Sequence, residues 1–90
     1  MVYMVERSLP GISNEQLAGA QQVAIRTADQ FSRQGTPVRY LRSTFVPAES
    51  RCLCLFEAAS GEIVRQVNEA AGLPFTTIVE ALHLPRPEGA

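Results

Sequence analysis

The strongest structural signal in this chain lies in residues 38–62, VRYLRSTFVPAESRCLCLFEAASGE. Residues 38–46 and 51–58 predict two strands, because runs of apolar and β-branched side chains lie between turn residues. The residues PAES at 47–50 predict the turn that joins these strands into a hairpin. Ser60 is a favourable N-cap residue, so a helix is expected to begin directly after the hairpin.

The flanking residues extend this pattern to strand, helix, strand, strand, helix, strand. Residues 2–7 predict the first strand, and Ser13 with Gln16 forms a capping box for a helix that runs to about residue 33. Gly35 and Gly72 supply helix ends, and residues 76–84 predict the last strand. Two βαβ units with right-handed crossovers give an α+β, ferredoxin-like βαββαβ sandwich. Its four-stranded antiparallel sheet has the order 4-1-3-2, with two helices on one face.

Composition indicates one small globular domain. We expect residues 1–84 to form that domain and residues 85–90, PRPEGA, to form a flexible C-terminal tail. No apolar run is long enough to span a bilayer and no secretory pattern is present, so we expect a cytoplasmic protein without a membrane partner. A net charge of −1 argues against nucleic acid as a partner. Because so short a chain has a thin core, a homodimer is expected.

Strand alternation predicts which residues lie on each face of the sheet. The face under the helices is expected to carry the aliphatic sets Val5, Leu41, Phe45, Leu53, Leu55, Val79 and Ala81. The open face is then expected to carry the candidate ligand-binding residues Glu6, Tyr40, Arg42, Cys54, Phe56 and Glu80. Charges on a covered surface must be paired or must coordinate a ligand. This face therefore predicts either a polar pocket between two subunits or ordinary ion pairs of Glu6 and Glu80 with Arg42 or Arg7.

Four residues are candidate metal ligands: Glu6, Cys52, Cys54 and the single histidine, His83. Cys52 and Cys54 lie two residues apart and point to the same face of their strand. They fit free buried thiols as well as metal ligands, because neighbours in one strand are poorly placed for a disulfide. The spacings His-x-x-His and Cys-x-x-Cys are absent, as are a Gly-x-Ser-x-Gly elbow and a Gly-rich phosphate loop. No catalytic residue is therefore identified.

Five short segments together resemble a known family. They are YMVER at 3–7, YLRS at 40–43, CLFEA at 54–58, AAGLP at 70–74 and IVEA at 78–81. Their order and spacing resemble a family of small actinobacterial proteins, known as nickel-binding proteins or as a domain of unknown function. The resemblance covers residues 3 to about 84. It implies a ferredoxin-like fold, a homodimer that packs sheet to sheet, and nickel as a ligand.

Three functions follow from these observations. The leading one is a cytoplasmic homodimer that binds a divalent metal, nickel among the candidates, or a small ligand at or near the open sheet face. The alternative is a cofactor-independent enzyme of the dimeric α+β barrel type, monooxygenase-like or cyclase-like, with an aromatic or polyketide-like substrate. In that enzyme Glu6 or Glu80 would be the acid or base, Tyr40 and Arg42 would orient oxygens, and Phe56 would stack on a ring. The third is a structural or regulatory dimer with a dry interface.

Overall fold

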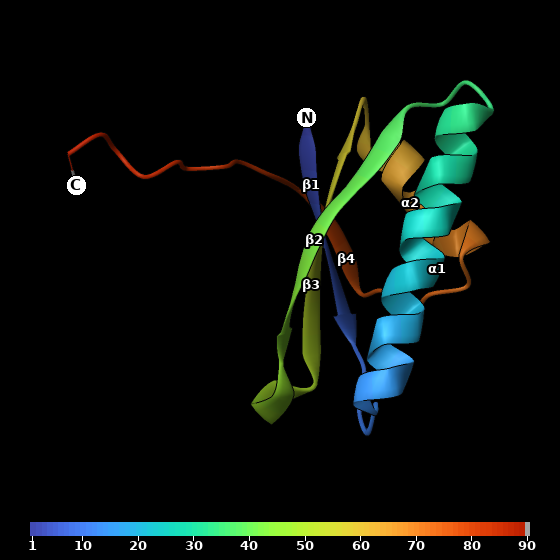
Figure 1. The fold of residues 1–90 in the computed structure, drawn as a ribbon, viewed down its shortest axis with the longest axis vertical. Helices are drawn as coiled ribbons and strands as arrows, with labels where there is room; N and C mark the ends of the chain where they lie inside the picture. Colours follow the sequence, from blue (N-terminus) through green and yellow to red (C-terminus); the bar gives the residue numbers. More distant parts are fainter. Residues whose placement is uncertain (90) are drawn as a thin grey trace.

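The computed structural model describes residues 1–89 and confirms the α+β class, with two helices on one side of a four-stranded antiparallel sheet (Figure 1). The elements are β1 (Val2–Ser8), α1 (Asn14–Arg33), β2 (Val38–Val46), β3 (Arg51–Ala58), α2 (Gly61–Ala70) and β4 (Thr77–Ala81). A short 3-10 turn, Pro47–Glu49, joins β2 to β3. Hydrogen-bonded neighbours run β2-β3-β1-β4, which read from the other edge is 4-1-3-2.

Local signals place the ends of both helices. The Ser13 hydroxyl accepts a hydrogen bond from the Gln16 backbone N–H, and the Gln16 side chain accepts one from the Ser13 N–H, each at 3.0 Å. This is the predicted capping box, and it satisfies two N–H groups that the first helical turn leaves without partners. Gly35 follows α1 with a φ of +96°, a left-handed conformation that glycine adopts without strain.

The structure corrects the predicted faces of β3. Cys52, Cys54 and Phe56 are buried under the helices, whereas Leu53 and Leu55 lie on the open face. Both alternating sets are apolar, so alternation alone does not distinguish them. The register does, because Cys54 lies opposite the fully buried Val5 of β1 and paired residues share a face.

A β-bulge corrects the predicted faces of β2. Tyr40 lies opposite Phe56 and Arg42 lies opposite Leu55, so Leu41 is an extra residue in β2. As a result Tyr40 and Ser43 both lie on the helix-bearing side, although they are three residues apart.

The faces predicted for β4 are inverted. Ile78 pairs with the buried Val5, so Ile78 lies on the helix-bearing side. Val79 and Ala81 pair with Met4 and Val2, and they lie on the open face instead of under the helices. The strand ends at Ala81, three residues before the predicted limit.

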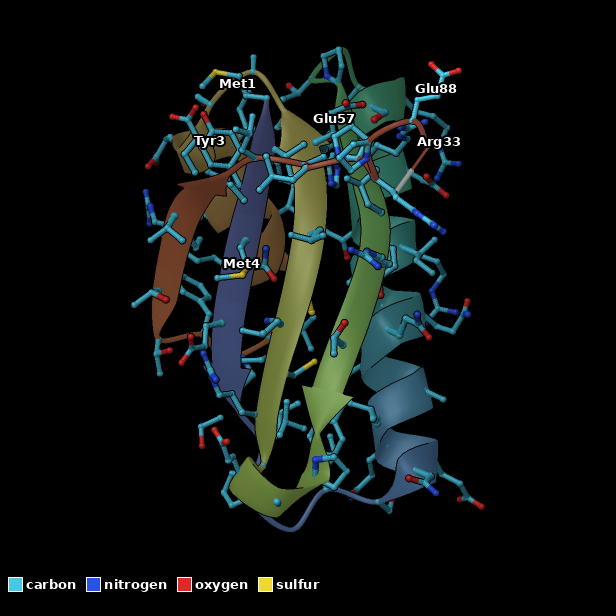
Figure 2. The ribbon with its side chains drawn as sticks, turned by 90° about the vertical axis from the view of Figure 1, so that its left-hand side faces the viewer. Met1, Tyr3, Met4, Arg33, Glu57 and Glu88 are labelled. Carbon is cyan, nitrogen blue, oxygen red and sulfur yellow. The ribbon has the colours of Figure 1, made fainter. Side chains whose placement is uncertain are left out.

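The open face of the sheet is uncovered by helices. Figure 2 looks onto this face and shows Met4 near its centre, with both helices behind the sheet. After β4 the chain leaves the sheet on this open side (Figure 1), and Leu82 and Leu84 are 82% and 85% exposed. The segment 85–89 contains neither helix nor strand, and Ala90, the last residue of the predicted tail, lies outside the described residues. Within residues 1–89 neither helix combines the length and the apolar character that crossing a membrane requires.

Candidate ligand-binding site

The predicted ligand-binding residues do not share one face of the sheet. Glu6 and Arg42 lie on the open face, but Tyr40, Cys54 and Phe56 lie on the helix-bearing side. Glu80 lies opposite Tyr3 on the edge strand β4, and its side chain is exposed. The single polar pocket predicted on the open face is therefore not formed.

Glu6 takes part in an ordinary ion pair. Its carboxylate lies 3.2 Å from the Arg51 guanidinium on the neighbouring strand β3, and Arg51 also lies 3.6 Å from Glu49. The ion-pair alternative thus describes Glu6, although the partner is Arg51 and not Arg42 or Arg7. Both side chains are partly exposed, so the pair contributes little to stability.

A cavity of about 250 Å³ lies on the other side of the sheet, beneath the N-terminal half of α1. Its walls are mostly apolar and come from α1, β2, β3 and the segments that precede α1 and follow α2. Six residues define these walls: Leu9, Leu17, Ala20, Ala24, Phe45 and Leu73. A concave, partly open pocket with apolar walls and a few polar groups is typical of small-molecule sites.

The polar groups of the cavity form a continuous hydrogen-bond chain. The Gln21 amide donates to the Tyr40 hydroxyl at 3.0 Å, and the Tyr40 and Ser43 hydroxyls lie 2.6 Å apart. Ser43 donates to the Cys54 sulfur at 2.9 Å, so Tyr40 must be the donor to Ser43. The chain ends at Cys52, whose sulfur lies 3.7 Å from that of Cys54.

The two cysteines are free buried thiols, as one of the sequence alternatives has it. Burial raises the pKa of the Cys52 thiol to about 11, and the neighbouring Cys54 adds to the increase. The thiol is therefore protonated at neutral pH. Because the thiolate is the form that binds metals and acts as a nucleophile, Cys52 is inert in both respects near pH 7.

Arg7 is the charged residue of the cavity wall, and sequence reasoning did not select it as a site residue. Its side chain is only 2% exposed, and it donates to the Pro74 carbonyl at 3.0 Å and to the Asn68 side-chain oxygen at 2.8 Å. Asn68 is itself fully buried and donates to the Val64 carbonyl at 2.8 Å. The sequence does carry one indication that Arg7 is buried, since Arg7 shares a strand face with the apolar residues Tyr3 and Val5.

The four candidate metal ligands are not assembled into a site. Glu6 lies on the open face, the two cysteines lie beneath α1, and the exposed His83 follows β4. Within residues 1–89, no three His, Cys, Asp or Glu side chains come close enough together to hold a metal ion. The donors of one chain therefore do not fit a nickel site, which needs several nitrogen, oxygen or thiolate ligands.

Comparison with known proteins places this fold in a family. The sequence model of the family "Nickel responsive protein SCO4226-like" matches residues 3–81. A crystal structure of SCO4226 from Streptomyces coelicolor A3(2) superimposes with a TM-score of 0.79 at 27% identity, covering 94% of this chain and 100% of that chain. No curated protein matches the chain significantly. Since the family match spans nearly all of the folded part, the chain belongs to the SCO4226-like family of nickel-responsive proteins.

Proposed function

We propose that this protein binds a small organic molecule in the cavity beneath α1. The observation that carries the proposal is the convergence of Arg7, Tyr40 and Ser43 on one half-open, mostly apolar pocket. Such groups fix the orientation of a ligand, while the apolar walls bury its nonpolar surface. The site therefore lies on the helix-bearing side of the sheet and not on the open face.

The size of the cavity limits the ligand to about one ring. A cavity of roughly 150 Å³ in a protein core holds benzene. The space beneath α1 measures about 250 Å³, which allows a ring with one or two small substituents. A multi-ring polyketide-like compound would have to extend through the open side of the pocket into solvent.

Binding accounts for this cavity better than catalysis does. The residues that line it include no Asp, Glu or His in the part of the chain that the structure describes. Glu6, a candidate acid or base of the enzyme alternative, lies on the opposite side of the sheet, and Glu80 is exposed. A general acid or base must reach the proton that it moves, so neither carboxylate supports that reaction here.

Filling the cavity should abolish ligand binding. We expect Ala20→Leu to weaken binding of one-ring probes such as phenol by about tenfold or more, because the added carbons occupy space that the ring needs. Titration followed by the backbone amide shifts of Ser43 and Cys54 measures this affinity. Ala70→Leu is the matched control, since Ala70 is an exposed helical residue outside the cavity. Equal weakening in both variants, or unchanged binding in Ala20→Leu, would contradict the proposal.

We also propose that the open face pairs with a second copy of this chain. Val79, Met4 and Leu55 form an apolar row across three strands at the centre of this face. Charged pairs flank the row, with Arg39 and Glu57 on one side and Arg51 and Glu6 on the other. An apolar centre inside a polar rim is the usual arrangement of a protein interface. The exposed Leu82 and Leu84, on the segment that leaves the sheet on its open side, would lie over the partner.

Family membership supports a response to nickel, and we propose that a nickel site forms only with donors from both subunits. His83 is the best single donor of the chain, because it is exposed and lies on the segment that projects from the open side. The thiols of Cys52 and Cys54 are excluded at neutral pH by their burial beneath α1 and by the raised pKa of Cys52.

Calorimetry with nickel tests this assignment. Wild-type protein should bind nickel with a fixed ratio of nickel ions to subunits. His83→Ala should weaken this binding by about tenfold or more, because one imidazole ligand is lost. Cys54→Ser should leave the affinity unchanged. Loss of binding in Cys54→Ser with retention in His83→Ala would instead place nickel on the thiols, and absence of heat in the wild type would rule out the nickel proposal.

A further inference from the structure

Arg7 is a buried cation without a compensating anion. Within residues 1–89, no Asp or Glu forms an ion pair with it, and both of its hydrogen bonds go to neutral acceptors, Asn68 and Pro74. Buried charges in proteins are normally paired or bind a ligand, because removal from water costs more than neutral hydrogen bonds return. Arg7 lines the pocket, and the small part of its surface that stays exposed is where such a ligand would meet it.

The groups around Arg7 hold its guanidinium in one orientation. Asn68 accepts from one terminal nitrogen and is anchored in turn to the Val64 carbonyl of α2, while Pro74 accepts from the other. Two hydrogen bonds leave further N–H donors of the planar fork available. Because the fork is fixed beforehand, an anion that binds there loses little of its binding energy to ordering the side chain.

The thiols beside Arg7 do not supply the missing negative charge. Arg7 acts to lower the pKa of Cys52, but burial and the neighbouring Cys54 outweigh it and raise that pKa to about 11. The remaining polar side chains of the wall, those of Asn14, Gln21, Tyr40 and Ser43, are amides and hydroxyls and not carboxylates. The cavity therefore carries one positive charge.

We propose that the ligand of this cavity is a small organic carboxylate, with its carboxylate on Arg7 and an apolar body of about one ring between α1 and the sheet. This inference rests on the proposed ligand site and adds the chemical class of the ligand. A planar carboxylate matches the guanidinium fork and carries the single charge that one arginine compensates. The apolar walls exclude a strongly hydrated dianion such as inorganic phosphate. A ring hydroxyl would exchange hydrogen bonds with Tyr40 and Ser43.

Benzoate and its neutral isostere benzamide test the inference, with binding followed by backbone amide shifts at Ser43, Cys52 and Cys54. Wild-type protein should bind benzoate at least about tenfold more tightly than benzamide, because a charge-assisted hydrogen bond usually changes an affinity by that factor. Asn68→Asp keeps Arg7 in place and gives it an internal carboxylate, so the preference for benzoate should disappear while benzamide binding stays the same. Arg7→Lys, which keeps the charge but not the fork, should reduce the preference without abolishing it.

The outcomes separate this inference from the proposed function. Equal affinity for benzoate and benzamide, with both lost in Ala20→Leu, would overturn the carboxylate and leave the cavity as a ligand site. A preference for benzoate that persists in both Asn68→Asp and Ala20→Leu would place the carboxylate on a surface arginine and overturn the inference. If neither probe shifts the cavity amides, the one-ring ligand site and the inference both fail.

Discussion

Phe56→Ala should lower the free energy of unfolding by about 3–5 kcal/mol, the usual cost of removing a fully buried aromatic ring. The Phe56 side chain is completely buried at the centre of β3, one of the two inner strands of the sheet. It lies between Tyr3 and Tyr40 in register, and its ring meets the Tyr40 ring edge to face at 5.5 Å. Truncation therefore leaves a cavity and also removes an aromatic contact worth about 0.5–1.5 kcal/mol.

Urea unfolding followed by far-UV circular dichroism measures this loss. Gln22→Ala is the control, because the Gln22 side chain is exposed on α1, away from the open face, and its truncation should change the free energy of unfolding by less than about 0.5 kcal/mol. A loss below about 1 kcal/mol for Phe56→Ala would mean that the core does not centre on this ring. Since Tyr40 also lines the cavity, the same variant should weaken binding of one-ring probes.

Met4→Glu should convert the proposed dimer into a monomer, with a dissociation constant raised by about 100-fold or more. Met4 lies at the centre of the apolar row on the open face, between Val79 and Leu55 in register. In a sheet-to-sheet dimer the two-fold symmetry brings two copies of the substitution to one interface, so each buried carboxylate would lack a partner. Analytical ultracentrifugation over a range of protein concentrations measures the effect.

Gln22→Glu provides the matched control for this variant. It adds the same charge on the exposed surface of α1, on the opposite side of the sheet from the open face, and should leave the association unchanged. Wild-type protein that stays monomeric at high concentration would refute the dimer. Dissociation of Gln22→Glu in parallel with Met4→Glu would point instead to the helix layer as the interface.

The order and ends of the elements could be predicted from the sequence because their causes are local. Ser13 and Gln16 specify the start of α1 within four residues of each other, and Gly35 specifies its end through its backbone conformation. The faces of β3 could not be predicted in the same way. Leu53 and Leu55 are as apolar as Cys54 and Phe56, and only pairing with β1 determines which set is buried.

The candidate site depends on contacts that are distant in sequence. Arg7 could be placed on the same strand face as Tyr3 and Val5, but its acceptor Asn68 lies 61 residues further along the chain. Nothing near Arg7 in the sequence indicates that this acceptor is an amide and not a carboxylate. Because it is an amide, the positive charge of Arg7 has no negative partner. The prediction of an open-face site failed for a related reason, because it needed the pairing partners of all four strands.

The bulge at Leu41 has an evolutionary consequence. In a regular strand, residues three positions apart point to opposite sides, and only the inserted residue lets Tyr40 and Ser43 point the same way. Because Leu41 is the residue without a partner on β3, deleting its codon would restore regular alternation, with Tyr40 still opposite Phe56 and Ser43 still opposite Cys54, so both hydroxyls would keep facing the cavity. The length of this strand can therefore differ by the bulge residue among homologues while the two hydroxyls of the cavity wall keep their places.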